Sequence, residues 1–161
     1  MVLGMSLAAF TLVHVVISLI AILAGLVVGY GLLNNKRFDE VNALFLLMTV
    51  ATSVTGFFFP FHGVTPGIKV GIISMIVLAI AILARYAFHL AGAWRRIYAI
   101  TAMLALYLNV FVLVVQSFEK VPALHALAPT QKEPPFAIAQ LAVLVLFIVL
   151  TVFASKKFHA A

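Results

Sequence analysis

Residues 6–33, SLAAFTLVHVVISLIAILAGLVVGYGLL, decide the fold class of this chain. The stretch contains no Asp, Glu, Lys or Arg, and it exceeds the about 20 apolar residues that cross a bilayer as a helix. We interpret it as a membrane span and not as a signal peptide, because its apolar run is too long and the first cationic residue, Lys36, follows it.

Further apolar stretches of similar length follow, and together they predict five spans: 6–33, 41–60, 67–90, 96–118 and 136–155. The longest connection, 119–135, contains several prolines and is expected to be an ordered or interfacial loop. The predicted fold class is therefore all-α, a polytopic transmembrane helical bundle. Residues 1–161 are expected to form a single domain.

The composition excludes several classes of protein. Of the 161 residues, 66% are hydrophobic and 9% are charged, whereas soluble domains have about 25% charged residues. The chain has no cysteine, which excludes disulfides, thiolate metal sites, iron–sulfur clusters and covalently attached c-type haem. The net charge of +6 comes from Lys and Arg scattered near the span ends, so we expect no nucleic-acid partner.

The distribution of Lys and Arg predicts the orientation in the membrane. Five spans place the two termini on opposite sides. One side then collects Lys36, Arg37, Arg85, Arg95, Arg96, Lys156 and Lys157, and the other collects Lys69, Lys120 and Lys132. The positive-inside rule makes the richer side cytoplasmic, so the N-terminus is expected outside and the C-terminus in the cytoplasm. Tyr30, Tyr86, Trp94 and Tyr98 are expected to form an interfacial belt at the cytoplasmic boundary.

Small and polar side chains recur on one face of each predicted span, which indicates faces that pack against other helices. In 6–33 this face carries His14, Ser18, Gly25 and Gly29, and the two glycines have the small-xxx-small spacing of closely packed helices. Arg85 lies near the cytoplasmic end of 67–90, where a long cationic side chain is expected to extend to the interface.

The strongest polar groups fall in the outer half of the bilayer when depth is counted at about 1.5 Å per residue. Ionisable groups inside a membrane are often functional. The sequence therefore predicts a cofactor or lipophilic-ligand site in the outer leaflet, lined by His14, Ser53, Asn109, Gln116 and Gln140, with His62 in the outer turn as a lid or second ligand.

Two redox cofactors suit such a site, and the sequence leaves the choice between them open. Haem b takes one or two axial ligands, commonly His, and His14 and His62 are the candidate metal ligands on one side of the membrane. A quinone needs a His or Gln donor in an apolar cleft, and residues 57–61 supply several phenylalanines. Zinc hydrolysis is disfavoured because no H-E-x-x-H spacing occurs, and no catalytic residue is assigned.

The same residues also have a structural interpretation. His14 can form a hydrogen bond with Ser18 one turn along, and the amides of Asn109, Gln116 and Gln140 can join helices. The chain would then be a non-enzymatic accessory or assembly subunit of a larger membrane complex, or a homo-oligomer. A small transporter is less favoured, because no Asp or Glu lies within a predicted span and no internal repeat is present.

Several segments together carry a resemblance: 52–62 (TSVTGFFFPFH), 89–96 (HLAGAWRR), 120–124 (KVPAL) and 127–131 (LAPTQ). The chain resembles small uncharacterised proteins of bacterial inner membranes, over nearly its whole length. This resemblance implies a single domain and a multi-pass location in a bacterial inner (plasma) membrane. No activity is known for those proteins, so the resemblance assigns no residue a role.

Overall fold

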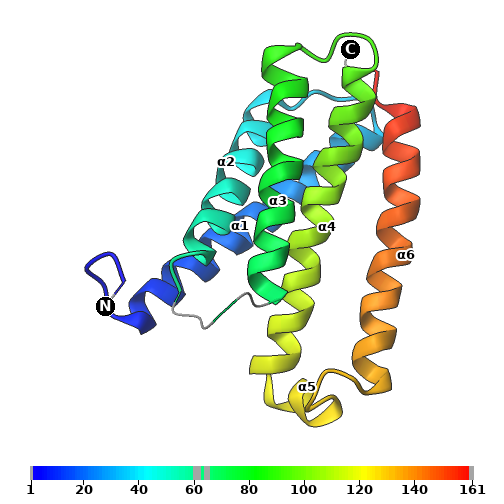
Figure 1. The fold of residues 1–161 in the computed structure, drawn as a ribbon. Coiled ribbons are helices and arrows are strands. Elements are labelled where there is room, and N and C mark those ends of the chain that lie inside the picture. The colour runs from blue at the N-terminus through cyan, green and yellow to red at the C-terminus, as the bar shows by residue number, and fades with distance from the viewer. Residues whose placement is uncertain (1, 60–62, 64–65, 160–161) are drawn as a thin grey trace.

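The computed structural model describes residues 2–59, 63 and 66–159, and this part of the chain is helical and contains no β-strand. In chain order the helices are α1 (Leu7–Leu33), α2 (Asp39–Gly56), α3 (Pro66–Ile82), the π-helix η1 (Leu83–Ala87), α4 (Trp94–Lys120), α5 (Pro122–Leu127) and α6 (Pro134–Lys157). They form a bundle (Figure 1), so the predicted all-α fold class is confirmed.

Among the described residues, four helical segments are long and apolar enough to cross a membrane: Leu7–Leu33, Gly67–Ala87, Trp94–Lys120 and Pro134–Lys157. This is consistent with the expected multi-pass membrane protein. The remaining long helix is α2, which covers most of the predicted span 41–60. It is less apolar, because Asp39 and Glu40 form its first turn and several hydroxyl side chains follow.

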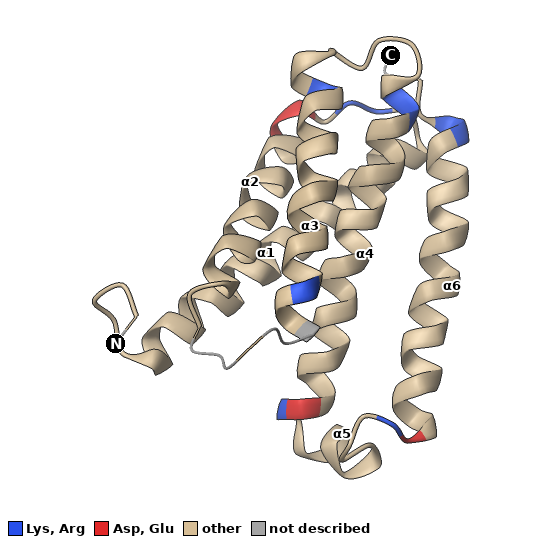
Figure 2. Cartoon of the chain, in the orientation of Figure 1, with Lys and Arg blue, Asp and Glu red and all other residues tan. Residues whose placement is uncertain are grey.

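The long helices run between two ends of the bundle, which we call upper and lower after Figure 1. At the upper end α1 leads into α2 through residues 34–38, η1 leads towards α4, and α6 ends. At the lower end lie the start of α1, the end of α2, α5 and the start of α6. α1 packs mainly against α2, and α4 contacts both α3 and α6. Figure 2 shows most of the described charged residues near these two ends.

The core is formed by the helix faces that carry the small and polar residues. Small and polar residues on these faces are buried in the bundle: Ala21, Asn42, Thr49, Ser74, Ala81, Ala102 and Ala105. Large residues such as Phe45 and Leu78 fill the space between them and are fully enclosed. Many Leu, Ile and Val side chains on the outward faces are exposed, as lipid-facing side chains of a membrane bundle are.

Gly25 lets α1 approach α2 and α4 closely. A Cβ atom at this position would lie 2.5 Å from Leu106 Cδ1 and 2.9 Å from Phe45 Cε1. The Phe45 ring is fully buried, so it has little room to move. Gly25→Ala is therefore expected to lower the free energy of unfolding by about 1–3 kcal/mol, measured by reversible unfolding in detergent.

Gly29 provides the matched control on the same face of α1. A Cβ there would lie 3.5 Å from Met103 Sδ, which is ordinary contact with a flexible side chain. Alanine also favours a helix over glycine by about 1 kcal/mol, so Gly29→Ala is expected to be neutral or stabilising. If both substitutions lower the free energy of unfolding equally, the helices do not pack more tightly at Gly25 than at Gly29.

The connection before α6 differs from its prediction in two respects. α4 continues to Lys120, so Glu119 lies in its last turn and not in the loop. The loop itself contains α5, which begins at Pro122, a position where the missing N–H of proline removes no helical hydrogen bond.

Glu133, the N-cap residue of α6, fixes the last part of this connection. Its carboxylate accepts hydrogen bonds from the Thr130 hydroxyl (2.7 Å), from the Thr130 backbone N–H (3.1 Å) and from the Lys132 N–H (3.0 Å). The bond from the Thr130 hydroxyl, followed by the backbone bonds, holds the pKa of Glu133 below its ordinary value of 4.5.

A depressed pKa means that Glu133 stabilises the folded loop above pH 4.5 and that this contribution is lost as the pH falls through the folded-state pKa. Thr130→Val removes the hydroxyl donor and is expected to raise the pKa of Glu133 toward 4.5. The measurement is an NMR titration of the carboxyl carbon in both proteins. An identical midpoint in the variant would rule out the hydroxyl as the main cause.

Candidate functional site

His14 extends from α1 toward α2 in the lower half of the bundle. Its Nδ1 lies 2.6 Å from Thr55 Oγ1. The Thr55 hydroxyl donates its single hydrogen to the carbonyl oxygens of its own helix, at 2.7 Å from Ala51 and 3.1 Å from Thr52. When the Thr55 hydroxyl donates to these carbonyls, Oγ1 accepts from His14 Nδ1–H, and in that imidazole tautomer the lone pair lies on Nε2.

Aromatic side chains pack on one side of the His14 ring. The Phe59 ring meets the imidazole edge to face with centroids 5.1 Å apart, and Phe10 packs against Phe59 at 4.9 Å. A Cβ on Gly56 would lie 3.6 Å from His14 Cε1, an ordinary contact distance, so the ring lies close to this turn of α2. The imidazole is half-buried, and its orientation is set by Thr55 and the two phenyl rings.

The hydrogen bond to Thr55 corrects one prediction from the sequence. Ser18 was expected to bond to His14, but its hydroxyl donates to the Val15 carbonyl at 2.7 Å. A serine in a helix can satisfy its hydroxyl on the backbone one turn before it, and here that local bond replaces the bond to His14. The prediction that His14 faces a neighbouring helix is confirmed by its contact with α2.

The other predicted site residues make separate contacts. Asn109 Nδ2 donates to Thr49 Oγ1 at 3.2 Å, which joins α4 to α2. Thr49 and Thr55 are six residues apart, so they lie about 120° apart around α2 and about 9 Å apart along it. The Asn109 contact and the His14 contact therefore use different faces of the same helix.

Gln140 of α6 donates from Nε2 to the Phe111 carbonyl at 3.3 Å, and its Oε1 is buried without a partner in the described part of the chain. Within residues 2–59, 63 and 66–159, no side-chain hydrogen bond joins His14 to Ser53, Asn109, Gln116 or Gln140. His62, the proposed lid or second ligand, lies outside the described residues.

In the described part of the chain, two surface hollows are formed by residues distant from His14. One, of about 210 Å³, is lined at the upper end by Gly92, Ala93, Arg95 and Arg96. The other, of about 390 Å³, is lined at the lower end by Glu119, His125, Pro129, Thr130 and Gln131. Among the described residues there is also no group of three or more His, Asp or Glu side chains that could hold a metal ion.

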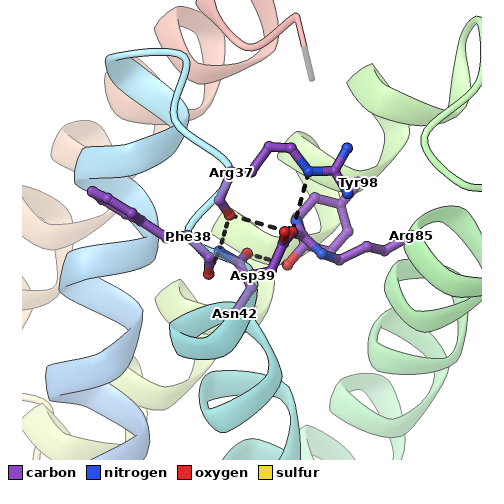
Figure 3. Close-up of polar contacts among 6 residues, drawn as sticks. All are labelled: Arg37, Phe38, Asp39, Asn42, Arg85 and Tyr98. Carbon is purple, nitrogen blue, oxygen red and sulfur yellow. Dashed lines mark hydrogen bonds and ion pairs between the residues drawn. The ribbon is translucent and has the colours of Figure 1, made fainter. Parts of the chain in front are cut away.

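A second polar group, which the sequence interpretation missed, lies at the upper end (Figure 3). We call it the Asp39 cluster, and it consists of Arg37, Asp39, Asn42, Arg85 and Tyr98. Arg85 Nη2 lies 2.5 Å from Asp39 Oδ1 and 3.1 Å from the Arg37 carbonyl oxygen. Arg37 Nε reaches the same carboxylate oxygen at 3.1 Å, so two guanidinium groups share one carboxylate.

Tyr98 and Asn42 form the floor of the Asp39 cluster. The Tyr98 hydroxyl donates to Asn42 Oδ1, and the Arg85 guanidinium lies 5.0 Å from the centre of the Tyr98 ring. Asn42 Nδ2 donates to the carbonyls of Arg37 and Phe38 at 2.8 and 2.9 Å, which ties the turn before α2 to its first helical turn. Every polar atom of the Asn42 side chain therefore has a partner.

Two predictions are wrong at this cluster. Arg85 does not extend freely to the interface, because it is only 4% exposed and is paired with Asp39. Tyr98 does not belong to an interfacial belt, because it is completely buried. Tyr30 and Tyr86, by contrast, are about half exposed, as belt residues are.

The backbone around Arg85 is irregular. Residues Leu83–Ala87 form the π-helix η1, a rare wide turn that often occurs at functional positions. After it, His89 and Leu90 both have positive φ angles, 51° and 59°, and the Leu90 N–H donates to the Ala84 carbonyl at 2.9 Å. Non-glycine residues in this region are strained, and the buried Leu90 side chain helps to hold them there.

Comparison of the chain with known protein families, with curated proteins and with solved structures finds no match in any of the three.

Proposed function

We propose that the chain is a small membrane redox protein that holds haem b or a quinone at His14. The observation that carries the proposal is the hydrogen bond between His14 Nδ1 and Thr55 Oγ1, because it orients the ring and, in the Nδ1–H tautomer, the lone pair is on Nε2. The apolar and aromatic surroundings supplied by Phe10 and Phe59 suit a lipophilic ligand.

With haem b, His14 Nε2 would hold the haem iron. A metal-bound imidazole commonly donates its other N–H to an oxygen acceptor, and Thr55 is that acceptor here. His62 is the proposed second ligand. Ser53, Asn109, Gln116 and Gln140 stay proposed as further polar groups of the site, although in the described part of the chain none of them forms a hydrogen bond with His14.

A quinol would use the same nitrogen in another way. Its hydroxyl would donate a hydrogen bond to the lone pair of His14 Nε2 in the Nδ1–H tautomer. Both ligands therefore require the Nε2 lone pair of His14 and the hydrogen bond between His14 and Thr55. Identification of the bound molecule distinguishes the two ligands.

The proposal is tested by extracting the protein, purified in mild detergent from the membranes of its host, and identifying the bound molecule by mass spectrometry. We expect haem b or a quinone in wild type and at least a tenfold lower content in His14→Ala. His125→Ala is the matched control, because His125 is an exposed histidine of α5. Wild-type protein without either molecule, or equal content in both variants, would count against the proposal.

The role of Thr55 is tested by Thr55→Val, which keeps the shape of the side chain and removes the acceptor. Loss of such a supporting contact lowers ligand affinity about 10–100-fold in metal sites. Thr52→Val is its control, because the Thr52 hydroxyl donates to the Met48 carbonyl and has no bond to His14. If Thr55→Val and Thr52→Val retain the same amount of ligand, Thr55 has no role in the site.

We also propose that α2 is a fifth span and that the upper end faces the cytoplasm of a bacterial cell. The seven basic residues of the predicted cytoplasmic side belong to the elements of the upper end, which supports this orientation. Because the chain has no cysteine, Lys36→Cys and Lys132→Cys each give a single reactive thiol. A membrane-impermeant maleimide added to whole cells is expected to label the second variant and not the first, and the opposite pattern would reverse the orientation.

The accessory-subunit interpretation is the second candidate, and α6 favours it. This helix buries less of its apolar surface within the chain than α1, α3 or α4. A partner helix of a larger complex, or of a second copy, would cover that surface. Native gel analysis in mild detergent distinguishes the two candidates, because an accessory subunit migrates with its complex and retains no cofactor alone.

A further inference from the structure

Arg85 has hydrogen-bonding capacity that the Asp39 cluster does not use. Its side chain is 2% exposed, and both of its hydrogen bonds are made by Nη2. Nη1 is buried and has no hydrogen-bond partner in the described part of the chain. An unsatisfied N–H of a buried charged group is costly, so native structures supply an acceptor from the protein, water or a ligand.

The charge balance of the cluster indicates what kind of acceptor is missing. Two guanidinium groups, Arg37 and Arg85, share the single carboxylate of Asp39, which leaves one positive charge uncompensated. The exposed side chains of Lys36, in the turn between α1 and α2, and of Arg95 and Arg96, in the first turn of α4, add positive charge at the same end. A negatively charged acceptor is therefore favoured over a neutral one.

The position of Asp39 shows how such an acceptor could enter. The Asp39 side chain is 65% exposed, whereas the guanidinium that it binds is almost completely buried. The carboxylate thus lies at the open rim of the cluster, above Arg85. An oxyanion that displaces this carboxylate from Arg85 leaves it at the exposed rim, where it is beside Arg37 and accessible to water.

We infer that Arg85 binds a phosphate-type oxyanion, which takes the place of Asp39 on the guanidinium and satisfies Nη1. A planar guanidinium presents pairs of N–H groups that match two oxygens of a phosphate. The Tyr98 ring supports the guanidinium from one face and so holds that plane in position. The phosphate is either the headgroup of an anionic phospholipid or free phosphate, and this inference does not depend on the His14 site.

The experiment uses the full chain in nanodiscs of phosphatidylcholine, with phosphatidylglycerol or inorganic phosphate as probes. Native mass spectrometry counts bound phospholipid, and thermal unfolding reports stabilisation by each probe. We expect wild type to retain phosphatidylglycerol at least tenfold more strongly than Arg85→Lys, which keeps the charge and loses the paired N–H groups. Arg95→Gln, a change of an exposed arginine at the same end, is expected to bind as wild type does.

Asp39→Asn is the second test, and it is expected to change the affinity in the opposite direction from Arg85→Lys. It removes the carboxylate that competes for Arg85, so affinity for the oxyanion is expected to rise severalfold and the probe to stabilise this variant more than wild type. Stabilisation by phosphatidylglycerol alone identifies a lipid headgroup, and stabilisation by inorganic phosphate as well identifies a site open to the free anion. The inference is overturned if Arg85→Lys and Arg95→Gln bind equally, or if Asp39→Asn binds no more tightly than wild type.

Discussion

Asp39→Asn is expected to lower the free energy of unfolding in phosphatidylcholine by about 2–3 kcal/mol. Removing one partner of a fully buried ion pair costs about 3–5 kcal/mol, because the other charge is left buried and unpaired. Here Arg85 is buried but Asp39 is open to water, which screens part of the interaction and reduces the loss. The substitution also removes a negative charge from the first turn of α2, where it interacts favourably with the helix dipole.

Glu40→Gln is the matched control for that prediction. Glu40 is the next residue in the same helical turn, is exposed, and makes no ion pair in the described part of the chain. Both substitutions remove one negative charge near the α2 N-terminus, so their difference isolates the interaction with Arg85. Similar unfolding midpoints for the two variants in detergent titrations would mean that the Asp39–Arg85 pair contributes little to stability.

Tyr98→Ala is expected to have a larger effect, about 3–5 kcal/mol, because it removes a completely buried aromatic side chain from the core. The loss has two parts that can be separated. Tyr98→Phe keeps the ring beneath Arg85 but leaves Asn42 Oδ1 without its donor, which is expected to cost about 1–3 kcal/mol.

Tyr86→Ala serves as the comparison for the tyrosine variants, because Tyr86 lies on η1 at the same end and is 47% exposed. Its effect on the free energy of unfolding is expected to be near the about 0.5 kcal/mol typical of surface substitutions. The measurement is again reversible unfolding in detergent. If Tyr98→Ala is no more harmful than Tyr86→Ala, Tyr98 does not anchor the Asp39 cluster.

The fold was predictable because the membrane limits the choices. An apolar run such as 6–33 has to be a helix if it crosses a bilayer, and small residues such as Gly25 mark where that helix meets others. The face of α1 that carries His14 was also predictable from the 3.6-residue period. Its partner was not, because the sequence contains no information on whether Ser18 bonds to the backbone or to the imidazole.

Arg85 was interpreted wrongly for a related reason. A long cationic side chain near a helix end usually extends to the interface, and its pairing with Asp39 joins residues 46 positions apart. No local pattern reveals such a pairing, and none predicts that the chain forms a π-helix at this point. Asp39 was placed in a loop, although it begins α2 and binds the arginine of the opposing helix.

The claim that His14 binds a redox cofactor is tested most directly by an absorption spectrum of the purified protein before and after dithionite reduction. For haem b we expect a Soret band that shifts on reduction in wild type and His125→Ala and is absent in His14→Ala. For a quinone we expect no Soret band, but an ultraviolet change on reduction by borohydride that is lost in the same variant. Spectra that are featureless in wild type, or that are unchanged by His14→Ala, would contradict the assignment of His14 as the cofactor ligand.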